Sequence, residues 1–159
     1  MIKHKLPEWI LLAYAEESEW KMSGLLAIGA ANAVDEQGKT ALMHAAILGK
    51  LPLLRKLIPV SDASAADKEG LNALMWASRS ARDAAAKELM RFVDTGLVDG
   101  KGRTALMWAA GSGAASIVRM LASQGNVAKR DNSGLTALDH ATRAGHDDCA
   151  KLCRPVFAV

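Results

Sequence analysis

Gly38-Lys39-Thr40 is the first of two stretches whose residue types could support chemistry. It matches the end of a phosphate-binding loop, in which backbone amides, a lysine and a hydroxyl hold phosphates and a metal ion. The first glycine of that motif would fall at position 33, which is Ala33, and the sequence predicts no strand before it. We therefore do not expect a nucleotide site.

The second stretch could hold a metal ion. His146, Cys149 and Cys153 are spaced so that a helix would place all three on one face. Zinc sites normally require four well-placed ligands, however. The two cysteines also occupy positions filled by Ile117 and Leu121 one repeat earlier. We interpret both as small core residues and expect no metal and no other cofactor.

Composition excludes several further classes of function. No serine or cysteine has a base partner fixed by spacing, so we expect no enzymatic activity. The net charge is +3, from 20 basic and 17 acidic residues. This excess is too small for the concentrated basic stripe of a nucleic-acid binder. No apolar run approaches the roughly 20 residues that span a bilayer, so we expect no membrane partner.

The N-terminal residues imitate a secretion signal. A basic start precedes a short apolar run at residues 9–15, but Pro7 and Glu8 interrupt the approach to it. The two cysteines do not form the disulfide framework of a small secreted protein. We expect a cytoplasmic protein, with the nucleus as the alternative compartment.

Residues of the same type recur every 32 positions over four copies. The recurring residues are an aspartate, a glycine, a leucine and two alanines: Asp35, Asp67, Asp99 and Asp131; Gly38, Gly70, Gly102 and Gly134; Leu42, Leu74, Leu106 and Leu138; Ala41, Ala73, Ala105 and Ala137; Ala45, Ala77, Ala109 and Ala141. A register held over four copies predicts a repeat architecture.

Each recurring position has a physical interpretation. Asp-x-x-Gly is typical of a turn. The next position can cap a helix with a side-chain oxygen in every copy: Thr40, Asn72, Thr104 and Thr136. The helix that follows should end near a glycine, at Gly49, Gly113 and Gly145. A second apolar-periodic stretch, such as residues 53–58, predicts a second helix.

Such short helices are marginally stable alone, so neighbouring units must bury their faces against each other. We predict an all-α solenoid of about five stacked helix-turn-helix units. The predicted units are 1–34 as a cap, 35–66, 67–98, 99–130 and 131–159, with degenerate caps at both ends. The unit 67–98 lacks a glycine at residues 80–82, and its Gly96 comes three residues late. We therefore expect a shifted second helix and a shortened, flexible finger there.

The segments DEQGKTALMHAA and DGKGRTALMWAA, together with Gly145-His146, resemble the ankyrin-repeat family. The family's proline is alanine in all four copies, and its histidine is replaced by Met43, Met75, Met107 and Asp139. The family's threonine-to-histidine hydrogen bond should therefore be missing. The resemblance implies a non-catalytic scaffold or adaptor that binds a partner protein through the concave surface of fingers and inner helices.

The resemblance also places the binding residues at the variable turn and helix-end positions. The candidate residues are Lys39, Ile47, Leu48, Lys68, Glu69, Leu71, Arg79, Lys101, Arg103, Asn132, Leu135 and Arg143. The variable turn and helix-end positions together carry six basic residues and two acidic ones, Glu36 and Glu69, which gives a net charge of +4. We therefore expect the partner segment to be acidic.

Two alternatives stay open. One is a regulator of an enzyme such as a protein kinase, by resemblance to ankyrin-type inhibitors of cyclin-dependent kinases. The other is a module of a larger signalling protein, against which Met1 and a cap at each end argue. The oligomeric state is not predicted.

Overall fold

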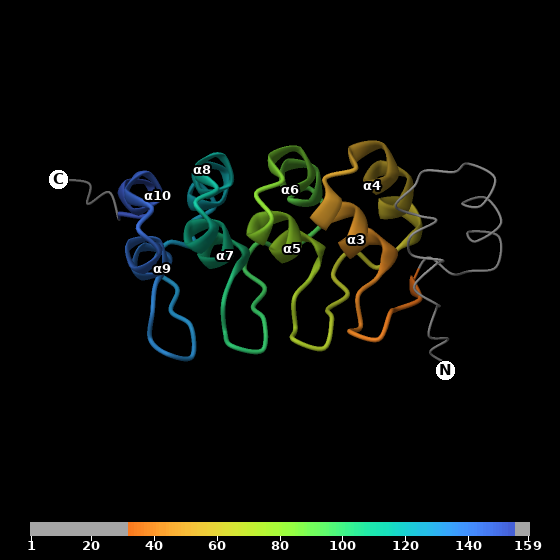
Figure 1. The fold of residues 1–159 in the computed structure, drawn as a ribbon, viewed down its shortest axis with the longest axis horizontal. Helices are drawn as coiled ribbons and strands as arrows, with labels where there is room; N and C mark the ends of the chain where they lie inside the picture. The colour runs from red at the N-terminus through yellow and green to blue at the C-terminus, as the bar shows by residue number, and fades with distance from the viewer. Residues whose placement is uncertain (1–31, 155–159) are drawn as a thin grey trace.

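The computed structural model describes residues 32–154 of the chain. This part contains eight short α-helices, arranged as four pairs (Figure 1). The first, inner helices of the pairs are α3 (Ala41–Leu48), α5 (Ala73–Arg79), α7 (Ala105–Ser112) and α9 (Ala137–Ala144). The second, outer helices are α4 (Leu51–Leu57), α6 (Asp83–Leu89), α8 (Ala115–Ala122) and α10 (Asp147–Leu152). A 3₁₀ turn, η2 (Ile58–Val60), continues α4.

The pairs stand side by side, with the inner helices in one layer, the outer helices in a second, and long finger loops projecting from the inner layer (Figure 1). This arrangement confirms the predicted all-α solenoid. The predicted cap at residues 1–34 lies almost entirely outside the described residues, and so does Pro155, which we expected to end the last helix.

The predicted caps of the inner helices are confirmed. Each capping side chain accepts the backbone N–H of the residue three positions later, at 3.0 Å for Asn72 and 3.3 Å for Thr40, Thr104 and Thr136. At the other end, Gly49, Gly113 and Gly145 adopt left-handed φ angles of 72–77°. These glycines let the chain reverse into the outer helix.

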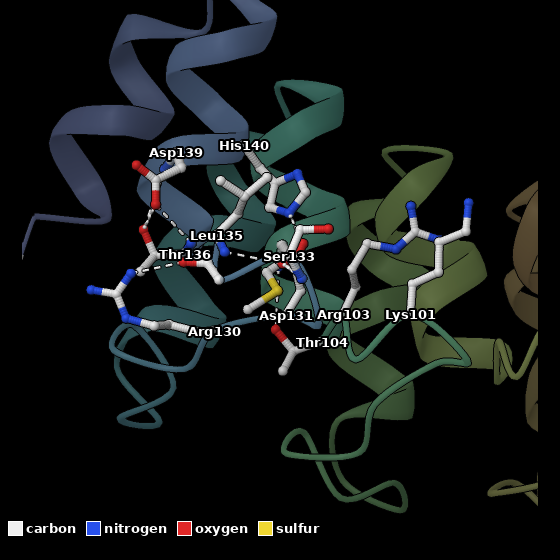
Figure 2. Close-up of polar contacts among 12 residues, drawn as sticks. Lys101, Arg103, Thr104, Arg130, Asp131, Ser133, Leu135, Thr136, Asp139 and His140 are labelled. Atoms are coloured by element: carbon white, nitrogen blue, oxygen red, sulfur yellow. Dashed lines mark hydrogen bonds and ion pairs between the residues drawn. The ribbon is translucent and has the colours of Figure 1, made fainter.

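The unit that begins at Asp131 has an additional cap contact. The carboxylate of Asp139 accepts hydrogen bonds from the backbone N–H (2.8 Å) and the hydroxyl (2.7 Å) of Thr136 (Figure 2). Together with the bond that Thr136 accepts, this forms a capping box. An aspartate thus takes over, in this unit, the side-chain bond that the replaced histidine of the family signature makes.

The expected irregularity of the unit 67–98 is wrong in two respects. Helix α6 begins at Asp83, 32 positions after α4 begins at Leu51, so it is not shifted. The finger is not shortened either, because Val98 bridges Thr104 as Val34 bridges Thr40. The register survives because Ala81 adopts the left-handed conformation, with φ of 52°, that glycine adopts elsewhere.

The core lies between the two helix layers and between neighbouring pairs. Leucine, methionine and alanine of the inner helices meet leucine, isoleucine and valine of the outer ones, and the central residues are fully buried: Leu42, Leu74, Leu106, Leu54, Leu89, Ile117, Val118 and Leu121. The recurring alanines, such as Ala45 and Ala109, are also fully buried. Their small side chains let adjacent inner helices approach closely.

Neighbouring fingers are joined by backbone hydrogen bonds. The three bonds, from N–H to carbonyl oxygen, run from Lys68 to Gln37 (3.0 Å), from Gly100 to Glu69 (2.9 Å) and from Asn132 to Lys101 (3.0 Å). The finger around Gly100, predicted to be flexible, is therefore bonded on both sides. None of the helices within residues 32–154 combines the length and apolar character that spanning a bilayer requires.

Candidate functional site

Each finger is shaped by one aspartate at its base. Oδ1 of Asp131 accepts the backbone N–H groups of Ser133 (2.8 Å) and Leu135 (3.0 Å), as Figure 2 shows. The same two bonds, at 2.8–2.9 Å, form at the other three finger aspartates: Asp35, Asp67 and Asp99. The finger backbone therefore keeps its shape whichever side chains stand at its tip.

The second carboxylate oxygen ties the finger to the inner helix. In each of the four described units, Oδ2 of the aspartate bonds a ring nitrogen nine residues later. The four distances are 3.0 Å for Asp35 and His44, 2.8 Å for Asp67 and Trp76, 3.1 Å for Asp99 and Trp108, and 2.8 Å for Asp131 and His140. The two tryptophans are partly buried against the core, and their ring nitrogens are directed toward the fingers.

The histidine-bonded aspartates favour the ionised form. Burial raises the pKa of Asp35, but hydrogen bonds from the backbone of Lys39, the ring of His44 and the backbone of Gln37 outweigh it and leave the pKa below its ordinary value of 3.8. The pKa of Asp131 is lowered in the same way, with burial opposing the bonds from the Leu135 backbone, the His140 ring and the Ser133 backbone.

The most distinctive feature of the inner surface, meaning the fingers and the exposed side of α3, α5, α7 and α9, is a row of cations and indole rings. Lys39 Nζ lies 4.6 Å from the ring centre of Trp76. Arg79 Cζ lies 5.0 Å from the Trp76 ring and 4.8 Å from the Trp108 ring. Arg103 Cζ lies 3.9 Å from the Trp108 ring. All four contacts are within cation–π range.

This row brings together Lys39, Arg79 and Arg103 from three predicted variable positions and adds two rings that sequence reasoning left out of the site. The signal that could have found the tryptophans is their spacing. Trp76 stands three residues before Arg79, and Trp108 stands five residues after Arg103. The two tryptophans are 32 positions apart.

Arg103 is less available than the sequence suggested. Its Nη2 lies 2.8 Å and its Nε 2.9 Å from Oδ2 of Asp99, a carboxylate with no exposed side-chain surface. Only 18% of the Arg103 side chain is exposed. Its charge is thus neutralised within the finger, so we correct its role from a free binding cation to a structural one. Figure 2 shows Arg103 on the finger next to the one that carries Asp131.

The predicted role of Leu71 as a partner-binding residue is also corrected, because its exposed fraction is 0% and it packs in the core. It cannot contact a partner while the protein is folded. The other predicted site residues do reach the surface. The exposed ones are Leu48, Lys68, Glu69, Arg79, Lys101, Asn132 and Arg143, and the partly buried ones are Lys39, Ile47 and Leu135.

The two cysteines that could have bound a metal lie in the core, as their repeat positions predicted, whereas His146 is only partly buried. Cys149 and Cys153 are each 1% exposed. Burial raises the pKa of both thiols, to about 11 for Cys153. Within residues 32–154, no three side chains of histidine, cysteine, aspartate or glutamate are grouped so that they could hold a metal ion.

Comparison with known proteins agrees with this geometry. The family model for ankyrin repeats (3 copies) matches residues 11–91 and 81–154, which together cover most of the chain. No curated protein matches the sequence. Ankyrin repeats are generally protein–protein interaction modules rather than catalysts. With its 32-residue register, paired helices and hydrogen-bonded fingers, this chain belongs to the ankyrin-repeat family.

Proposed function

We propose that the chain, as one repeat domain over residues 1–159, is a non-catalytic adaptor that binds an acidic segment of a partner protein through its inner surface. The observation that carries this proposal is the row of cations and indole rings across three adjacent units. Tryptophan and arginine are the residues that most often dominate binding energy at protein interfaces. We propose the cytoplasm as its location, with the nucleus as the alternative.

Charge supports the same surface. Lys68 and Lys101 stand exposed on adjacent fingers, while the acidic finger residues Asp67 and Asp99 are turned inward to bond their own backbone. The exposed finger residues Glu36 and Glu69 balance these two lysines. The excess positive charge of the inner surface therefore comes from Lys39, Arg79 and Arg143. Complementary charge of this kind mainly raises the association rate and makes it sensitive to salt.

The test uses two charge-matched double variants of the full chain in quantitative affinity capture. Lys68→Glu with Lys101→Glu changes the fingers, and Lys87→Glu with Arg119→Glu changes exposed residues of the outer helices α6 and α8. Captured partners should be lost with the finger pair and retained with the outer pair. Loss with the outer pair alone would overturn the proposal, because the partner would then use the opposite face.

A further inference from the structure

One position on the inner helices differs sharply between units. It follows the ring position by three residues and is occupied by Ile47, Arg79, Gly111 and Arg143. Only Arg79 has an indole on each side, at 5.0 Å from Trp76 in its own unit and 4.8 Å from Trp108 in the next. The guanidinium carbon thus lies within cation–π range of both rings, which restrains the group while its N–H groups remain available as donors.

Arg79 also keeps its charge uncompensated. Among residues 32–154, carboxylates pair with Arg103, Arg55 and Arg91, but none pairs with Arg79. The residue is exposed at the end of α5. A stacked guanidinium retains N–H donors along its edge, and two of them can bond both oxygens of one carboxylate.

Gly111 gives a second, independent indication. It lies inside α7, where glycine costs about 1 kcal/mol relative to alanine. No packing explains it, because an added Cβ would meet nothing within 4 Å. The ends of α5 and α7 lie together, since the Ser112 hydroxyl donates to the Ser78 carbonyl at 2.9 Å. The surface next to Arg79 is therefore open down to the helix backbone.

We propose that Arg79, clamped between Trp76 and Trp108, binds an aspartate or glutamate carboxylate of the partner segment, and that Gly111 admits that segment's main chain. The inference rests on the proposed function and names its anchor. A carboxylate fits better than a phosphate. The neighbouring Arg103 is already neutralised by Asp99, so a single free guanidinium faces the ligand, and a doubly charged phosphate would require more positive charge.

The probe is a library of random-sequence peptides selected on the full chain, whose selected members are then synthesised and their dissociation constants measured by fluorescence anisotropy. Selected peptides should share one aspartate or glutamate. Arg79→Gln and Arg79→Lys should each weaken binding by about 30-fold or more, as loss of an interface anchor does. The lysine variant keeps the charge but loses the flat, two-pronged contact.

The matched control is Arg143→Gln, which removes an exposed arginine from the same position two units later. It should change the dissociation constant by less than about 3-fold. Gly111→Val, which adds bulk where nothing else lies nearby, should weaken binding while circular dichroism shows the fold intact. Replacing the shared acidic residue by phosphoserine should weaken binding; tighter binding would overturn the assignment of a carboxylate.

Failure of the anchor and failure of the proposed function give different results. If acidic peptides bind, and lose affinity with Lys68→Glu and Lys101→Glu but not with Arg79→Lys, the inner surface is correct and the anchor is wrong. If the selected peptides lack acidic residues, both the anchor and the acidic character of the partner segment are wrong. If no peptide binds, or only the outer pair Lys87→Glu and Arg119→Glu abolishes binding, both are wrong.

Discussion

Ala81 adopts the left-handed backbone conformation that glycine adopts at the equivalent position of the other described units. The position at which the chain reverses from an inner helix into the outer helix adopts the left-handed conformation in every described unit where the reversal is seen. Glycine does this at Gly49, Gly113 and Gly145, whereas Ala81 does it with φ of 52°. A side chain with a Cβ is strained in this conformation, by about 1 kcal/mol.

Replacing Ala81 by glycine should therefore stabilise the protein. We expect the free energy of unfolding, measured by urea denaturation, to rise by up to about 1 kcal/mol, because relief of strain exceeds the greater freedom of glycine in the unfolded chain. Gly145→Ala, at φ of 77° with nothing within 4 Å of the added Cβ, should lower it by a similar amount. A loss of stability in Ala81→Gly would contradict the strain.

The finger aspartates predict how stability depends on pH. The pKa of Asp35 and that of Asp131 are lower in the folded protein than the ordinary value of 3.8. Their contribution is therefore fully present above pH 3.8 and is lost as pH falls through the folded-state pKa. Thermal melting followed by circular dichroism should show a melting temperature that falls as the pH drops below 3.8.

Asp131→Asn provides the control for this acid loss. The amide keeps an oxygen for the N–H groups of Ser133 and Leu135 but cannot ionise. The variant should be less stable at neutral pH and should lose less stability on acidification. An unchanged pH dependence would show that other carboxylates dominate acid unfolding.

At the scale of the element, the fingers behave as a connected edge rather than as independent loops. One backbone hydrogen bond joins each finger to the next. Gly70 makes this approach possible, because a Cβ there would lie 2.6 Å from the backbone nitrogen of Gly100. Its φ of 87° also requires a left-handed conformation. Both features follow from packing between units rather than from the turn alone.

Gly70→Ala should thus cost more than the same change in an open finger. We expect a loss of about 2–4 kcal/mol in the free energy of unfolding, from backbone strain and displacement of the neighbouring finger. Gly134→Ala is the matched control: its φ is 77°, but an added Cβ meets nothing within 4 Å. It should cost only about 1 kcal/mol. Equal losses in urea denaturation would show that contact between fingers adds nothing.

The helices and turns were predictable because each depends on residues close in sequence. Thr104 caps α7 by accepting the N–H of the residue three positions later, Asp99 accepts N–H groups two and four residues away, and Gly113 directly follows the helix that it ends. The recurrence of these residue types every 32 positions was enough to find them. The register of α6 was mispredicted because Ala81 adopts a conformation that composition alone assigns to glycine.

The site was predictable only in part. Exposure and charge at Lys68, Lys101 and Arg143 followed from their variable positions. The place of Arg79 between two indoles depends on how α5 stacks on α7. Spacing along the chain does not specify this contact, because it is made between units. Nor does spacing distinguish Leu71, which is fully buried, from Leu135, which stands at the same repeat position and is only partly buried.

For the whole molecule, position in the stack decides how much an equivalent residue contributes. Leu106 in α7 has an exposed fraction of 0%, with a helix pair on each side. Leu138 occupies the same position in α9, the last inner helix of the described chain, and is only partly buried. The stability of a repeat protein is approximately a sum of units and their interfaces, so the interior residue takes part in two interfaces.

Leu106→Ala should lower the free energy of unfolding by about 2–5 kcal/mol, through lost burial and the cavity left behind. Leu138→Ala should cost about 1 kcal/mol, because its site is partly solvated. Urea denaturation of the two variants provides the comparison. A loss below about 1 kcal/mol for Leu106→Ala would place that residue outside the core.

The hydrogen bonds between fingers have a consequence for how such a gene can change. Each joins a carbonyl to the N–H 31 residues later, so every unit recognises only the unit before it and the unit after it. An in-frame tandem duplication of residues 99–130 would give the new copy the same partners on both sides, and its Trp108 would lie beside another Gly111. Unequal recombination could therefore lengthen the molecule, and with it the partner segment it accommodates, while leaving the Arg79 clamp intact.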